Sequence, residues 1–218
     1  MRYRLIVFDW DGTLVDSTAA IADCIRAAAR DMGLPVPDRE RATHVIGLGL
    51  HDSLRHAVPE LPSSGYEEFV AHYRRHFLAC EDRIRPFPGV PETLAELTGR
   101  GHRLAVATGK SRRGLDRALA ATGLTLYFAA TRCADETQPK PHPAMLRELI
   151  GMLAEAPSST IMVGDTGHDL QMAASAGVDA VAVQSGAHSA EVLRTFAPRA
   201  CLKDVRELPQ WLATLTLA

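Results

Sequence analysis

The chain has no excess of positive charge and very little lysine. Its 24 Lys and Arg residues and 26 Asp and Glu residues give a formal net charge of −2 at pH 7. Nucleic acids and acidic membrane surfaces select basic patches, so we expect neither as the main partner. The only lysines are Lys110, Lys140 and Lys203. A lysine at the spacing of a catalytic motif is therefore hard to attribute to chance.

Cysteine is also sparse, and it forms no sequence motif. The four cysteines are far apart, without a CxxC pair or a dense framework: Cys24, Cys80, Cys133 and Cys201. This pattern is typical of reduced, packed thiols in a reducing compartment, and it excludes a disulfide scaffold.

Long apolar runs are missing as well. No stretch reaches the roughly 18 apolar residues that a membrane helix requires. The first apolar run, Leu5–Phe8, stops at Asp9 and is too short for the core of a signal peptide. We therefore expect a cytoplasmic protein without a membrane partner. A monomer and a homodimer both fit the sequence.

The remaining composition is that of a globular protein. Hydrophobic residues make up 46% of the 218 residues and charged residues 23%, which is ordinary for a chain with a real core. The length suits one core domain that carries a small accessory domain.

Strand-like and helical patterns alternate along most of the chain. Besides Leu5–Phe8, we expect strands at Arg103–Thr108, Leu126–Thr131, Thr160–Gly164 and Ala180–Val183. We expect helices at Val90–Arg100, Ser111–Thr122, Pro143–Leu153, Asp169–Ala176, Ser189–Phe196 and Val205–Leu212. This alternation predicts right-handed βαβ units, and hence an α/β fold with a doubly wound parallel sheet.

One segment departs from the alternation. Between the first two strands only helical patterns occur: one from Ser17 to before Gly33, then Asp38–Ile46, Leu50–Ala57 and Tyr66–Cys80. Two prolines within Arg85–Gly89 block helix and suggest a return linker. We therefore expect a core domain of residues 1–15 and 86–218, with a small all-helical domain of residues 16–85 inserted after the first strand.

Polar residues follow four of the predicted strands. They are Asp9 and Asp11 after the first strand, Thr108 and Gly109 after the second, Lys140 after the third, and Asp165 and Asp169 after the fourth. Ligands bind beyond the carboxyl ends of strands in open parallel sheets. Clustered carboxylates need a cation, and hard oxygen ligands suit Mg²⁺. A lysine and a threonine hydroxyl near backbone amides suit a phosphate.

These residues together predict phosphate-ester chemistry. A carboxylate such as Asp9, beside a phosphate whose charge is neutralised, can attack phosphorus and form an aspartyl-phosphate. A second carboxyl two residues later, Asp11, can protonate the leaving alkoxide and then deprotonate the attacking water. The expected partner is a small phosphorylated metabolite.

Four segments resemble, in order, the four motifs of the haloacid dehalogenase-like (HAD) hydrolases. They are Asp9-Trp10-Asp11-Gly12-Thr13-Leu14-Val15-Asp16-Ser17, Val106-Ala107-Thr108-Gly109-Lys110, Lys140-Pro141-His142-Pro143 and Gly164-Asp165-Thr166-Gly167-His168-Asp169. The resemblance covers nearly the whole chain, and the helical insert resembles the α-helical cap of the subfamily that includes phosphoglycolate phosphatase. Trp10 stands where phenylalanine is more usual, which bears on packing.

The resemblance implies a role for each matching carboxylate. Asp9 matches the nucleophile and a direct Mg²⁺ ligand. Asp11 matches the general acid/base, whose backbone carbonyl also binds the metal. Asp165 matches the second metal ligand, and Asp169 matches a carboxylate that orients metal-bound water or Lys140. Capping of the helix that follows is an alternative role for Asp169.

The resemblance also implies a phosphate site. Thr108 and Lys140 match the groups that hold the phosphoryl oxygens, with the Gly109 backbone beside them. Three neighbouring residues are not included in the predicted site, because structural roles explain them as well: Lys110, Thr166 and His168.

Other activities of the family fit less well. Haloacid dehalogenases do not need Asp11, and the phosphoryl-transfer ATPases carry threonine there. Phosphonatases need a cap lysine, but no lysine lies between Gly12 and Gly109. A sugar phosphomutase that uses Asp9 and Asp11 in the same way remains an alternative function. A binding module that has kept an inactive phosphatase fold is a second alternative, disfavoured by the complete motifs.

The insert offers two sets of specificity candidates. The loop Gly47-Leu48-Gly49-Leu50 is expected either over the active site or as a plain turn between helices. Four basic residues can either meet a carboxylate of the substrate or lie on the surface: Arg39, Arg41, His44 and Arg55. The Arg74-Arg75 pair is expected on a solvated helix face.

Overall fold

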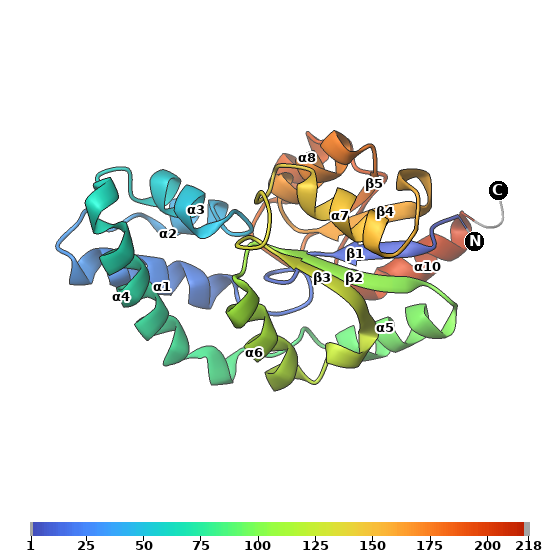
Figure 1. The fold of residues 1–218 in the computed structure, drawn as a ribbon, viewed down its shortest axis with the longest axis horizontal. Helices are drawn as coiled ribbons and strands as arrows, with labels where there is room; N and C mark the ends of the chain where they lie inside the picture. Colours follow the sequence, from blue (N-terminus) through green and yellow to red (C-terminus); the bar gives the residue numbers. More distant parts are fainter. Residues whose placement is uncertain (1, 216–218) are drawn as a thin grey trace.

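The central feature of the fold is a six-stranded, all-parallel sheet in the order β3-β2-β1-β4-β5-β6. The computed structural model describes residues 2–215 (Figure 1). Its strands are β1 Leu5–Phe8, β2 Arg103–Thr108, β3 Phe128–Cys133, β4 Thr160–Gly164, β5 Asp179–Val183 and β6 Ala200–Leu202. The predicted α/β fold with a doubly wound parallel sheet is confirmed.

Helices cover both faces of the sheet because its strands are apolar on both sides. Ile6 and Phe8 of β1 pack with helices α5, α6 and α10, whereas Leu5 and Val7 pack with α7, α8 and α9. Figure 1 shows α7 and α8 on the opposite side of the sheet from α5 and α6. The bounds are α5 Val90–Gly99, α6 Arg112–Thr122, α7 Ala144–Met152, α8 Gly167–Ala176, α9 Ala190–Arg194 and α10 Leu208–Thr214. Each fully buried large apolar side chain contributes about 1.5–3 kcal/mol to this core.

Some predicted boundaries are wrong. The third strand begins at Phe128, two residues later than predicted, because Thr125–Tyr127 form a 3₁₀ turn that leaves Leu126 97% exposed. The edge strand β6 was not predicted, since three residues are too few for a periodic pattern. The predicted last helix begins as a 3₁₀ turn, Val205–Glu207.

The segment between β1 and α5 contains only helices. They are α1 Thr18–Asp31, α2 Arg39–His44, α3 Leu50–Ala57 and α4 Tyr66–Leu78, with 3₁₀ turns at Ser63–Gly65 and Glu81–Arg83. They enclose an apolar cluster of their own, which includes Ile25, Leu54 and Phe69, and they extend to one side of the sheet (Figure 1). We call residues 16–85 the helical insert.

The helical insert joins the sheet through two adjacent chain segments. Val15 pairs with Pro86 in an isolated bridge, and the Asp16 amide donates a 3.0 Å hydrogen bond to the Arg85 carbonyl. The division into residues 1–15 with 86–218 and residues 16–85 stays a prediction. Within residues 2–215, no helix combines the length and apolar character needed to span a membrane.

Candidate active site

Asp9 lies where β1 ends, at the carboxyl edge of the sheet. Its amide still donates to the Val163 carbonyl of β4 at 2.9 Å, so β4 holds the backbone that carries this carboxylate. The following turn needs glycine at position 12, because Gly12 has φ +85° and an added Cβ would collide with the Asp165 carboxylate. The Asp-x-Asp-Gly pattern therefore brings the ends of β1 and β4 together.

Lys140 lies between two of the predicted carboxylates. Its Nζ is 2.5 Å from Asp9 Oδ1 and 2.6 Å from Asp169 Oδ1, and all three side chains are at most 1% exposed. Burial lowers the pKa of Lys140, but the charges of Asp169 and Asp9 outweigh it and raise that pKa above its ordinary value. Lys140 is therefore a permanently charged group at the centre of the site.

The ammonium of Lys140 alone does not balance the negative charge of the carboxylates in this site. Burial raises the pKa of Asp9 well above its ordinary value; Lys140 opposes this effect, while the charges of Asp169 and Asp165 add to it. Burial, with the charge of Asp169, raises the pKa of Asp165 to about 7. A further cation would stabilise both ionised forms.

Three carboxylates are placed to hold that cation. Asp9, Asp165 and Asp169 each offer one oxygen, and these three oxygens lie within 4.8 Å of one another. Asp9 Oδ2 is buried and has no hydrogen-bond partner among residues 2–215. A compact, all-oxygen donor set that includes this unpartnered oxygen fits Mg²⁺. The Asp11 side chain lies outside this group, and its predicted metal contact through the backbone stays a prediction.

Asp165 is held by groups that the sequence analysis did not identify. Thr13 Oγ1 donates to Asp165 Oδ1 at 2.7 Å, and the Ala187 amide donates to Asp165 Oδ2 at 2.7 Å. Gly186 has no room for a Cβ beside this carboxylate. In the sequence, the polar, glycine-containing pair Ser185-Gly186, which follows β5 after Gln184, indicates a turn but not this contact.

Asp169 contacts both the start of α8 and Lys140. Its Oδ2 accepts hydrogen bonds from the Thr166 amide at 3.1 Å and the Thr166 hydroxyl at 2.6 Å, which caps α8. Its Oδ1 is the oxygen beside Lys140. Helix α8 begins at Gly167, two residues earlier than predicted.

Asp11 faces two donors, and one of them was missed. Its Oδ1 accepts hydrogen bonds from the Ser17 hydroxyl at 2.6 Å and from Lys110 Nζ at 3.0 Å. Lys110 was excluded because a lysine there can simply begin a helix. The scarcity of lysine and the position two residues after Thr108 were signals in its favour.

Thr108 and Gly109 lie at the end of β2, beneath a loop of the helical insert. Thr108 is fully buried, and its hydroxyl accepts from the Lys110 amide at 3.2 Å. A Cβ on Gly109 would lie 2.5 Å from the Leu48 carbonyl oxygen and 2.7 Å from that of Gly47. The Gly47–Leu50 loop therefore packs directly on the predicted phosphate-binding segment.

The four basic candidates of the insert lie elsewhere. All are exposed: Arg39, which pairs with Asp23; Arg41, which bonds the His56 carbonyl; His44; and Arg55. His44 stacks on His188 with ring centroids 4.5 Å apart. Among the described residues, the cavity next to Asp11 is lined by other side chains.

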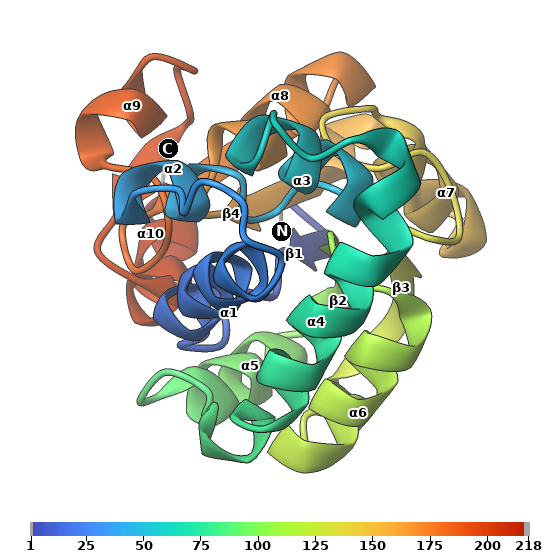
Figure 2. The same cartoon turned by 90° about the vertical axis from the view of Figure 1, so that its left-hand side faces the viewer.

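This cavity lies between the helical insert and the core. It has a volume of about 1000 Å³ and reaches from Asp11, Gly109 and Lys110 to helices α1 and α4. Figure 2 views the molecule from the insert, with α1 and α4 in front of the sheet. The site thus combines a buried charged cluster with a cavity that is large enough for the non-phosphate part of a substrate.

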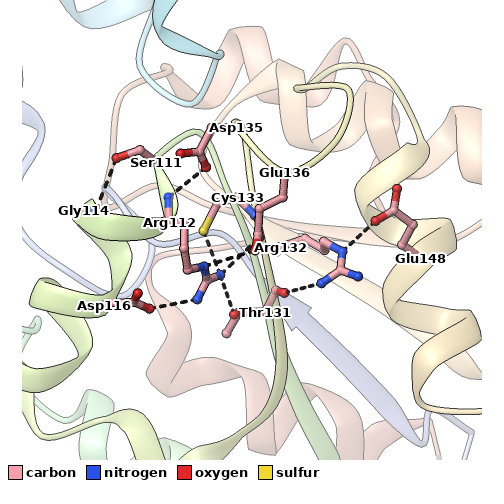
Figure 3. Close-up of polar contacts among 10 residues, drawn as sticks. All are labelled: Ser111, Arg112, Gly114, Asp116, Thr131, Arg132, Cys133, Asp135, Glu136 and Glu148. Carbon is pink, nitrogen blue, oxygen red and sulfur yellow. Dashed lines mark hydrogen bonds and ion pairs between the residues drawn. The ribbon is translucent and has the colours of Figure 1, made fainter.

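A polar network beside the site ties the start of α6 to β3 (Figure 3). The Arg112 guanidinium donates to Thr131 Oγ1 at 2.7 Å and to Cys133 Sγ at 2.9 Å. The backbone amide of Arg112 donates to Asp135 Oδ1. The Ala134 amide bonds the Lys110 carbonyl at 3.0 Å. These contacts fix the backbone of Lys110 against the segment that leads to Lys140.

The comparisons with known proteins agree with one another. The model of the "Haloacid dehalogenase-like hydrolase" family matches residues 6–183. "Probable phosphatase IndB" of Dickeya dadantii is 36% identical over 94% of this chain and 91% of its own length. A phosphoglycolate phosphatase of Agrobacterium fabrum is 34% identical over 84% of this chain and 81% of its own. The structure of a predicted phosphoglycolate phosphatase from Haemophilus somnus superposes with a TM-score of 0.86 at 26% identity, covering 97% and 99% of the two chains.

Proposed function

Because the chain belongs to the haloacid dehalogenase-like hydrolase family, we propose that it is a Mg²⁺-dependent phosphatase of small-molecule phosphate monoesters. The family match agrees with the recognition from the four motifs. The observation that carries the proposal is the buried cluster of Asp9, Lys140, Asp165 and Asp169, in which Asp9 Oδ2 has no partner among the described residues. The resemblance alone suggests a phosphoglycolate-like ester or a sugar phosphate, and it does not fix the alcohol part of the substrate.

The phosphoryl group would lie against the end of β2 and the Lys140 ammonium. Lys140 Nζ, the Thr108 hydroxyl and the backbone amides beside Gly109 are the donors for its oxygens. A bound Mg²⁺ would be held by Asp9, Asp165 and Asp169, and would neutralise charge on the carboxylates and the phosphoryl oxygens. Preorganised charge of this kind is the largest part of catalysis in many enzymes.

Asp9 and Asp11 divide the chemistry between them. Asp9 attacks phosphorus, so a bond from its carboxylate oxygen to phosphorus forms while the bond to the leaving oxygen breaks. Asp11 gives its proton to that leaving oxygen and later takes one from the water that hydrolyses the aspartyl-phosphate. Ser17 and Lys110 hold Asp11 in place from the side of the insert and of the core.

We propose the helical insert as a mobile cap on a core domain of residues 1–15 and 86–218. The two chain segments at Val15 and Pro86 form its connection, and the packing of Leu48 on Gly109 represents the closed position. Closure would keep bulk water away from the phosphorylated Asp9, and opening would release product.

Phosphate release from p-nitrophenyl phosphate tests the proposal. Wild type should be inactive after chelation and active again with Mg²⁺, and Asp9→Asn should lose nearly all activity in either condition. Activity that survives in Asp9→Asn would exclude Asp9 as the nucleophile. A sugar phosphomutase remains the second candidate; it would isomerise a sugar phosphate without releasing free phosphate, so product analysis separates the two.

A further inference from the structure

The cavity beside Asp11 is much larger than a leaving group such as glycolate requires. Its volume of about 1000 Å³ lies at the upper end of the roughly 300–1,000 Å³ typical of sites for whole drug-sized ligands. Glycolate has only a handful of non-hydrogen atoms and would leave most of this space to water. The volume therefore favours a bulky leaving group.

One wall of the cavity is an aromatic face of α4. Val70, Tyr73 and Phe77 line the cavity, and their spacing places them on the same side of the helix. The rings of Tyr73 and Phe77 are stacked, with centroids 6.0 Å apart and planes 21° apart. Ile21 and Ile25 of α1 add apolar surface to the lining. An apolar or aromatic body gains contact area with this wall.

The aromatic wall is continuous with the acid/base group. Lys110 Nζ lies 4.8 Å from the centroid of the Phe77 ring, and the same atom bonds Asp11 at 3.0 Å. Lys110 is thus a common neighbour of the Asp11 carboxylate and the Phe77 ring, and both Asp11 and Phe77 line the cavity.

The charges that line the cavity do not select an anionic leaving group. Four basic and four acidic residues balance there: Arg74, Lys110, Arg113 and Arg117 against Asp11, Asp52, Glu67 and Asp135. Lys110 is engaged by Asp11 and Arg117 by Glu81, and Arg74 and Arg113 are exposed. A carboxylate placed against the apolar wall would lose hydration without gaining a buried cation, which is costly.

We propose that the substrate is the phosphate monoester of a bulky, predominantly apolar or aromatic alcohol, whose body lies between α1 and α4 against Tyr73 and Phe77. The proposal rests on the function proposed above. The bond between phosphorus and the alcohol oxygen breaks, Asp9 takes the phosphoryl group, and Asp11 protonates the alcohol oxygen. Phosphoglycolate is then a poor substrate.

A series of primary-alcohol esters tests this proposal, because their leaving oxygens are similar in reactivity. Ethyl, butyl and 2-phenylethyl phosphate and 2-phosphoglycolate are compared by kcat/KM in the presence of Mg²⁺. Each buried methylene should raise kcat/KM by about fourfold, so 2-phenylethyl phosphate should exceed ethyl phosphate by more than tenfold. Phosphoglycolate should be no better than ethyl phosphate.

A variant with a larger side chain in the cavity tests whether the preference for the bulky ester arises there. Val70 lies seven residues from Phe77, or about 10 Å along the helix axis, so Val70→Trp fills the part of the cavity far from Lys110. The ratio of kcat/KM for 2-phenylethyl over ethyl phosphate should fall at least fivefold. Val36→Trp, at an exposed position of the same insert (39% exposed), should leave the ratio unchanged.

The outcomes separate the two proposals. If wild type releases phosphate but prefers phosphoglycolate, or treats ethyl and 2-phenylethyl phosphate alike, the proposed substrate class is wrong and the phosphatase function stands. If no ester in the series releases phosphate, and p-nitrophenyl phosphate also fails, the function itself is wrong. The wild-type series decides even if Val70→Trp does not fold.

Discussion

The Lys110 ammonium lies 3.0 Å from Asp11 Oδ1, the same oxygen that accepts the Ser17 hydroxyl at 2.6 Å. Both side chains of the Lys110–Asp11 pair are close to 10% exposed, at 12% and 9%. A charged donor and a neutral donor on one oxygen leave the other oxygen of Asp11 for the substrate. From this geometry we infer that Lys110 positions Asp11, the proposed general acid/base, without taking part in the chemistry itself.

Replacing Lys110 should therefore harm poor leaving groups more than good ones. We expect Lys110→Met to lower kcat for ethyl phosphate about 30-fold, within the range that general acid catalysis supplies. For p-nitrophenyl phosphate, whose leaving group needs little protonation, the loss should be less than fivefold. Lys110→Arg should restore part of the activity. Equal losses on both esters would show that Lys110 acts on the phosphoryl group instead.

The candidate metal centre makes stability depend on pH in the metal-free protein. The pKa of Asp165 is raised to about 7 in the folded protein, first by burial and then by the charge of Asp169, against roughly 3.9 when unfolded. The folded state binds more protons at Asp165 between these values, so the contribution of this one group to stability is fully present below about pH 4 and is lost as the pH rises towards 7.

Added Mg²⁺ should counteract that loss. We expect the increase in Tm on adding Mg²⁺ to chelator-treated protein to be much larger at pH 8 than at pH 5, because the cation binds the ionised carboxylates. Asp165→Asn cannot ionise at this position, so it should show a small increase at both pH values. An equal increase in wild type at pH 5 and pH 8 would contradict the assignment of this cluster as the metal site.

The sequence predicts the charged centre better than its surroundings. Asp9, Thr108 and Asp165 were predictable because the ends of parallel strands meet at one edge of a sheet. The contact from Ala187 was not, since a backbone amide has no sequence signature. Lys110 was ambiguous because only tertiary packing brings it to Asp11. The edge strand β6 and the shifted start of β3 depend on local turns that leave no periodic pattern.

The contact between Gly109 and the insert loop predicts an intolerance of a single methyl group. In Gly109→Ala the new Cβ would meet the backbone carbonyls of Leu48 and Gly47, and rigid backbone atoms cannot turn away as a side chain can. We expect the loop to be displaced and kcat/KM to fall more than tenfold.

A matched glycine shows whether that loss is specific. Gly151, in helix α7, has nothing within 4 Å of an added Cβ. Gly151→Ala should keep full activity and gain about 0.5–1 kcal/mol in the free energy of unfolding, because alanine favours helix. If Gly109→Ala is as active as Gly151→Ala, the Gly47–Leu50 loop does not need to lie on the phosphate-binding segment during turnover.

The two roles of Asp169 can be separated by changing one partner at a time. Thr166→Val removes the hydroxyl that bonds Asp169 Oδ2 at 2.6 Å and leaves the carboxylate beside Lys140. Losing this cap should cost about 1 kcal/mol in the free energy of unfolding, with kcat within a few fold of wild type.

Asp169→Asn keeps an oxygen for the cap but removes the charge 2.6 Å from Lys140 Nζ. It should bind Mg²⁺ at least tenfold more weakly and lose more than 100-fold in kcat, as measured by phosphate release across a Mg²⁺ titration. If Thr166→Val were the more damaging of the two for catalysis, the cap at the start of α8, and not the charge of Asp169, would be the feature that the reaction requires.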